Sequence, residues 1–153
     1  PQPCRSPSWV SGVAVRRKHQ STLDLGGHWQ TDRMREVFAH EAVLEMAPDA
    51  DMQAPGAAIT SALCGHWDHE PPCPLAPHHT HAARVDGQLQ VRTLFAVEPL
   101  LEGEVRLRID RALATGQVSG PDGATTRWQL RSSRRSAIAQ NETDHGERLR
   151  TSR

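Results

Sequence analysis

The dipeptide Asp86-Gly87 lies between two runs of residues with extended character, Thr80–Val85 and Gln88–Val97. Both central residues of a two-residue type I′ turn need positive φ, and Asp-Gly meets this need at low steric cost. In the second run, every other residue is suited to a buried face of a strand. These residues are Leu89, Val91, Thr93, Phe95 and Val97. The sequence therefore predicts a β-hairpin here.

Other segments also have the character of strands, and turn residues separate them. Pro48 and the residues beside it end the first segment, although its pattern also allows a short helix. Strands at this spacing predict an all-β fold, a small antiparallel sandwich or open barrel of about five to seven strands. The further predicted strands are Val37–Met46, Ala57–Trp67, Glu104–Leu113 and Thr125–Arg131.

The two ends of the chain lack any regular pattern, and we expect residues 1–33 and 132–153 to be poorly ordered. The β domain then spans residues 34–131. The hydrophobic share of 37% supports unpacked ends, because globular domains usually reach about 45–50%. Both ends are basic: residues 1–35 hold six basic residues and two acids, and residues 131–153 hold six arginines and three acids. They are expected to be solvated tails, and weak contact with nucleic acid is the alternative.

The sequence holds no apolar run of about 18 residues, so we expect no membrane span. It also lacks the apolar stretch of a secretory signal at its N-terminal end, which favours the cytoplasm. The chain begins at Pro1, and Met34, just before the first regular segment, is an expected alternative start.

A cluster of cysteine and histidine residues is the most informative chemical feature of the chain. Residues 64–81 contain two of the three cysteines and five of the nine histidines. Thiolate and imidazole together suit Zn²⁺, so this segment predicts a zinc site, although its spacing is not that of a zinc finger. The candidate ligands are Cys64, His66, His69, Cys73, His78, His79 and His81.

Two ligand sets follow from the expected strands. Residues i and i+2 of a strand share a face, so paired strands would present Cys64 with His66 and His79 with His81. The proline-rich connection between the strands has restricted freedom, which favours a second set. This alternative set is Cys64, His66, Cys73 and His78.

Several other interpretations of the cluster stay open. Cys64 and Cys73 can form a disulfide in an oxidising compartment, or the segment can be a polar loop that binds no metal. A metal-dependent hydrolase would use Asp68 or Glu70 as a base beside a metal-bound water. His40 shares the face of Phe38 in the first strand, which predicts a buried histidine with satisfied hydrogen bonds. No catalytic residue is assigned, and we expect a zinc-binding accessory module with an unidentified protein partner.

Overall fold

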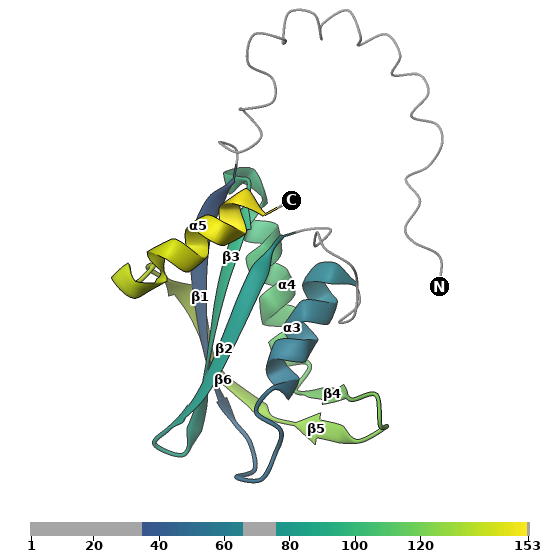
Figure 1. The fold of residues 1–153 in the computed structure, drawn as a ribbon. Helices are drawn as coiled ribbons and strands as arrows, with labels where there is room; N and C mark the ends of the chain where they lie inside the picture. Colours follow the sequence, from purple (N-terminus) through teal and green to yellow (C-terminus); the bar gives the residue numbers. More distant parts are fainter. Residues whose placement is uncertain (1–34, 66–75, 153) are drawn as a thin grey trace, which may run out of the picture. The chain divides into compact units, whose positions relative to one another are not determined.

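The computed structural model describes residues 35–65 and 76–152, which belong to one compact unit that starts at Met34. These residues form strands, three α-helices and two short 3-10 helices (Figure 1). In chain order the elements are β1 (Glu36–Glu45), α3 (Ala54–Cys64), β2 (His78–Val85), β3 (Gln88–Val97), η2 (Pro99–Leu101), α4 (Glu102–Ala114), β4 (Gln117–Ser119), β5 (Thr125–Arg127), β6 (Gln129–Ser136), η3 (Gln140–Glu142) and α5 (Thr143–Thr151).

The main sheet has four strands in the order β2-β3-β1-β6, and every neighbouring pair is antiparallel. With α3 between β1 and β2, and α4 between β3 and β6, the order of elements is β-α-β-β-α-β. This is the split βαβ arrangement, in which strands from both halves of the chain alternate in one sheet. The small β4-β5 hairpin is inserted before β6.

Helices cover both faces of this sheet. Figure 1 shows α3 and α4 on one side and α5 crossing the other side. The core lies between the sheet and the pair α3 and α4, where side chains of β1 and β3 meet those of the helices. The largest core side chains are Phe95, Leu44, Ile59, Leu63, Leu89, Ile109 and Leu113.

The predicted hairpin is confirmed. β2 and β3 pair from Val85 opposite Gln88, and Asp86 and Gly87 have φ of 52° and 80°. The alternating residues of β3 are buried on the face toward α3 and α4, as their period of two indicated. Strand β1 agrees with the first predicted strand to within one residue at each end.

The predicted strand Ala57–Trp67 is wrong for its described residues, because residues 54–64 form helix α3. Pro55 stands in the first turn of the helix, where a missing N–H leaves no hydrogen bond unmade. Ile59 and Leu63 are both fully or nearly fully buried, and their spacing of four residues places them on one helical face. Gly65 ends the helix in the left-handed conformation, with φ of 79°.

The predicted strand Glu104–Leu113 is also a helix, α4. Val105, Ile109 and Leu113 are completely buried, whereas Leu107 is exposed. A repeat of four residues puts those three side chains on one helical face. The alternation of apolar and charged residues in this segment suggested a strand, but it does not correspond to one. The prediction of an all-β sandwich or barrel is therefore corrected to a predominantly antiparallel sheet with packed helices.

The C-terminal segment is ordered, so the prediction of a poorly ordered tail at residues 132–153 is wrong for the described residues. β6 pairs with β1 along residues 39–45, and α5 packs on β1 and β3. The register between β1 and β6 shifts between Val43 and Leu44, which leaves Arg131 of β6 without a partner in the register. Trp128, just before β6, is buried. The order of this segment was not predictable from its hydrophobic pattern, because it has few apolar residues. Its contacts are mainly ion pairs and sheet hydrogen bonds.

Candidate functional site

Cys64 and His78 come together on the helical side of the sheet. Cys64 is in the last turn of α3, His78 is the first residue of β2, and Cys64 Sγ lies 4.0 Å from His78 Nδ1. Thr60, one helical turn before Cys64, has its Oγ1 3.1 Å from His78 Nε2. The spacing of four residues on α3 therefore directs both side chains at the same imidazole.

The surroundings of this pair are partly apolar. Cys64 is 6% exposed and belongs to the core cluster, and His78 is half-buried. The carbonyl oxygen of Ala76 lies 3.1 Å from His78 Nδ1, so both ring nitrogens have partners. This arrangement fixes the orientation of the ring while its Nδ1 edge faces the sulfur.

His79 and His81 lie on the opposite face of the sheet. The register places His78 opposite Phe95, which faces the helical core, and His79 opposite Leu94. Because side chains alternate along a strand, His79 and His81 point toward α5. The first predicted ligand set, which joined Cys64 to this pair, is therefore not brought together.

A third histidine from α5 joins the second face, and sequence reasoning missed it. The rings of His79 and His145 have centroids 4.4 Å apart and planes inclined by 42°. Burial lowers the pKa of His79, and the charges of His145 and His81 lower it further. His145 was overlooked because the segment around it lacked the pattern of a helix.

His66, His69 and Cys73, together with Asp68 and Glu70, lie outside the described residues. Within residues 35–65 and 76–152, no group of three or more His, Cys, Asp or Glu side chains is placed to hold a metal ion. The described part contains four of the seven predicted ligands: Cys64 and His78 form one close pair, and His79 and His81 lie on the other face of the sheet.

His40 forms a buried polar network of a different kind, and the prediction of a satisfied core histidine is confirmed. Its Nδ1 lies 3.0 Å from a guanidinium nitrogen of Arg106, and its Nε2 lies 2.7 Å from Ser133 Oγ and 3.2 Å from Asp110 Oδ1. Because a guanidinium only donates, Nδ1 accepts, and the ring proton resides on Nε2.

This combination of Ser133, His40 and Asp110 does not have the geometry of a hydrolytic triad. In a triad the carboxylate accepts from one ring nitrogen while the other accepts the serine proton. Here the serine and the carboxylate share the same nitrogen, which carries the proton. Burial lowers the pKa of His40, and the charge of Arg106 adds to this while Asp110 opposes it. The network is therefore structural.

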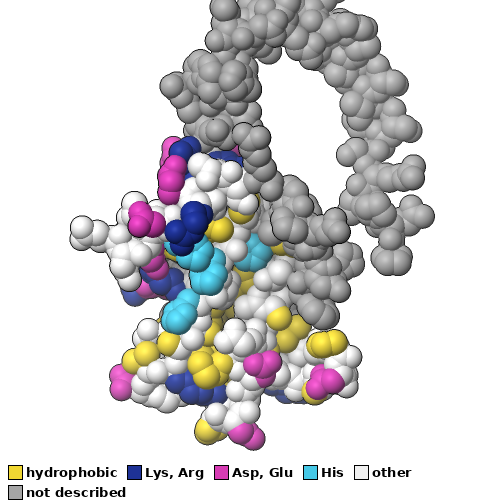
Figure 2. All heavy atoms as spheres, viewed as in Figure 1, with side chains coloured by type: hydrophobic (Ala, Val, Ile, Leu, Met, Phe, Trp, Pro, Cys, Tyr) yellow, Lys and Arg dark blue, Asp and Glu magenta, His cyan; other side chains and the backbone are white. Residues whose placement is uncertain are grey.

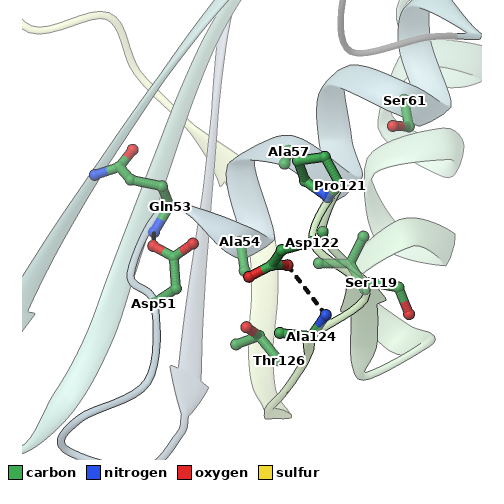
Figure 3. A pocket seen from close by; sticks show the side chains of 12 residues that line it. Asp51, Gln53, Ala54, Ala57, Ser61, Ser119, Pro121, Asp122, Ala124 and Thr126 are labelled. Carbon is green, nitrogen blue, oxygen red and sulfur yellow. Dashed lines mark hydrogen bonds between the residues drawn. The ribbon is translucent and has the colours of Figure 1, made fainter.

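A cleft of about 510 Å³ lies between α3 and the β4-β5 hairpin (Figure 3). Small side chains of α3, Ala54, Ala57 and Ser61, form one wall, and the turn at 119–124 forms the other. Its two carboxylates are used within their own loops, since Asp51 accepts from the Gln53 N–H and Asp122 from the Ala124 N–H. None of the described residues that line the cleft is a histidine, cysteine, lysine or arginine.

The arginines of β6 are paired with acids of the same domain. Arg131 bonds Glu45, Arg134 lies 3.1 Å from Glu41, and Arg135 lies 3.4 Å from Glu102. Surface pairs of this kind are weak, and they offset the charge of these three arginines only. Among the described residues, no helix has the length and apolar character needed to cross a membrane.

Comparison with known proteins adds no family. No protein-family model, curated protein or solved structure matches this chain.

Proposed function

We propose that the protein binds a zinc ion through a site that contains Cys64 and His78, and that it acts as a binding or accessory module. The observation that carries the proposal is the 4.0 Å separation between Cys64 Sγ and His78 Nδ1. With zinc–sulfur and zinc–nitrogen bonds of about 2.3 and about 2.0 Å, two ligands of a tetrahedral ion lie about 3.5 Å apart. A small rotation of either side chain closes the difference.

The position of the pair in the chain supports the same proposal. Cys64 and His78 stand at the two ends of the segment that holds the other predicted ligands, His66, His69 and Cys73. Because the ends already meet, the entropy lost when this segment closes around an ion is small. We propose that two of these three side chains complete the coordination.

The local chemistry also suits a cation. The C-terminal end of a helix carries partial negative charge, and Cys64 occupies the last turn of α3. This partial negative charge disfavours an unbound thiolate at Cys64 and favours a thiolate that is bound to a metal ion. Zinc bound at His78 Nδ1 would take the place of the hydrogen bond to the Ala76 carbonyl, and the single ring proton would move to Nε2. There it can bond Thr60 Oγ1, as a ligating histidine commonly bonds a neighbour through its second nitrogen.

The test is elemental analysis of the full chain, purified without a histidine tag, beside Cys64→Ser and His78→Ala variants. We expect about one zinc per chain, its loss in both variants, and a lower melting temperature after loss. Cys4→Ser is the matched control, because it removes a thiol outside the cluster, and it should keep the zinc. Zinc retained in Cys64→Ser, or a Cys64–Cys73 disulfide found by mass spectrometry in metal-free protein, would refute the proposal.

One outcome would change the class of function. If the metal is lost and stability does not change, a hydrolytic role becomes the better proposal, with Asp68 or Glu70 as base beside a metal-bound water. Ester or phosphoester hydrolysis by the zinc-loaded protein, abolished in Cys64→Ser, would then be the measurement to make.

A further inference from the structure

The face of the sheet opposite Cys64 carries its own group of histidines. Figure 2 shows histidine side chains gathered where β2 and α5 meet. His79 and His81 come from β2 and His145 from α5, and all three are exposed or half-buried. We propose that they bind a second divalent transition-metal ion, one that prefers imidazole ligands, and that this ion clamps α5 to the sheet.

The distance between the rings fits such an ion. Two imidazoles bound to one metal through bonds of about 2.0–2.1 Å have ring centroids about 4.5–5.2 Å apart, for angles from about 90° to tetrahedral. The rings of His79 and His145 are 4.4 Å apart. The three side chains are not placed around one point in the structure as it stands, so the proposal requires rotation of the side chains to turn a nitrogen of each ring to a shared ion.

His81 supplies the third ligand of the proposal. It stands two residues after His79, and residues i and i+2 of a strand project from the same face. His81 would reach the ion by a change of rotamer, which its exposure permits.

The backbone positions of these ligands are fixed by contacts that do not involve histidine. Gly146, next to His145, lies against Val37, where an added Cβ would stand 2.9 Å from Val37 Cγ1. At the start of α5, Glu142 receives two hydrogen bonds from Arg92, at 2.5 and 2.7 Å. A site supported by such contacts loses little entropy when it binds its ion.

The positive charge near the three histidines is compensated by acidic side chains, so it does not oppose the binding of a cation. Arg92 stands opposite His81 in the sheet register, and its charge is compensated by Glu142 and Glu41. Asp144 is exposed beside His145 and adds negative charge. Because the sheet separates this group from Cys64 and His78, the two proposed sites can be tested independently.

The experiment is calorimetric titration with Ni²⁺ of the full chain carrying Cys64→Ser, so that the thiolate site does not contribute. We expect binding that His145→Phe weakens by about tenfold or more, a loss typical of a disturbed metal site. Phenylalanine keeps the ring contact with His79 but has no nitrogen. Arg148→Ala, an exposed change on the same helix, is the control and should bind like its parent.

Hydrogen exchange gives a second measurement of the clamp. Ni²⁺ should slow the exchange of amides 143–151 in the parent and leave them unchanged in His145→Phe. His79→Phe leaves the sequence of α5 intact and should lose the same protection. No Ni²⁺ binding by the parent, equal affinity in the parent and the His145→Phe variant, or binding that leaves amides 143–151 unprotected would each overturn the proposal.

Discussion

The guanidinium of Arg106 donates a hydrogen bond to His40 Nδ1 at 3.0 Å in the core, between helix α4 and strand β1. The same nitrogen also donates to the carbonyl of Ala39 at 2.9 Å, and Nε donates to Glu102. Arg106 is 8% exposed, and its charge lies over the rings of Phe38 and Phe95. One buried cation thus joins the helix to the centre of the sheet.

Replacement of Arg106 by alanine should therefore be strongly destabilising. It would leave the ring nitrogen of His40 and the carbonyl of Ala39 without their donor, and it would leave space beside Phe95. We expect a loss of about 3–5 kcal/mol in the free energy of unfolding, measured by urea denaturation.

Arg108→Ala is the matched control for that change. Arg108 pairs with Glu104 on the same helix with the same spacing, but both side chains are nearly half exposed. Its loss should cost no more than about 0.5 kcal/mol. Similar losses for the two variants would mean that Arg106 contributes only a surface ion pair.

The stability of the fold should fall as the pH drops below 6.5, the ordinary pKa of histidine. Burial lowers the pKa of His40 in the folded protein, so the unfolded chain binds the proton first. The contribution is complete above pH 6.5 and is lost as the pH falls toward the folded pKa. His79 shifts in the same direction and adds to the effect.

The share of His40 is measurable with His40→Gln, because glutamine can accept from Arg106 and does not titrate. Urea unfolding at about pH 7.5 and about pH 5.5 should show a smaller pH-dependent loss in this variant than in the parent. An unchanged difference between the two pH values would assign the effect to other groups.

Local signals were sufficient for part of the fold. The hairpin around Asp86 and Gly87 was predictable because turn chemistry and a period of two agreed over both strands. Strand β1 was also predicted correctly, although its own pattern allowed a short helix. The positions of α3 and α4 were not, since short apolar segments with β-branched residues such as Ile59 suit either structure until their partners are known.

The candidate site was predictable in its chemistry and not in its arrangement. The sequence identified Cys64 and His78, but the assumption of a strand at Cys64 put it on the face of His79. Cys64 is instead in a helix. Thr60 lies one turn before it on the same helical face, and both side chains therefore reach the ring of His78. The contact of His145 with His79 depends on the packing of α5, which no local pattern revealed.

Gly146→Ala should destabilise the packing of α5, although alanine is the better helix former. The new methyl group would stand 2.9 Å from Val37 Cγ1, and such overpacking costs about 1–3 kcal/mol. Gly103 offers a control in helix α4, since an added Cβ there meets nothing within 4 Å. Gly103→Ala should be stabilising by about 0.5–1 kcal/mol. The melting temperatures of Gly146→Ala, Gly103→Ala and the double variant Val37→Ala/Gly146→Ala are compared. If the double variant recovers the stability that Gly146→Ala loses, the contact with Val37 is the cause.

Arg92→Lys should release α5 from the sheet while the rest of the fold stays intact. Arg92 donates to both carboxylate oxygens of Glu142, to Glu41 and to the carbonyl of Ala137. A lysine carries one ammonium and cannot reproduce this forked geometry, so we expect a local loss of about 1–2 kcal/mol. Hydrogen exchange of amides 143–151 should accelerate more than that of β1. Arg84→Lys is the control, because Arg84 makes a single bond to Ala47, at 2.7 Å.

The same contact has a pH dependence of defined sign. The hydrogen bond from Arg92 lowers the pKa of Glu142 below its ordinary 4.5, so its stabilising contribution is present above pH 4.5 and is lost as the pH falls through the folded value. In Arg92→Lys this acid-dependent loss of protection in α5 should shrink. The contrary result is that amides 143–151 exchange alike in both proteins at neutral and at acid pH. The docking of α5 would then depend on the Gly146–Val37 contact, which carries no charge, and not on Arg92.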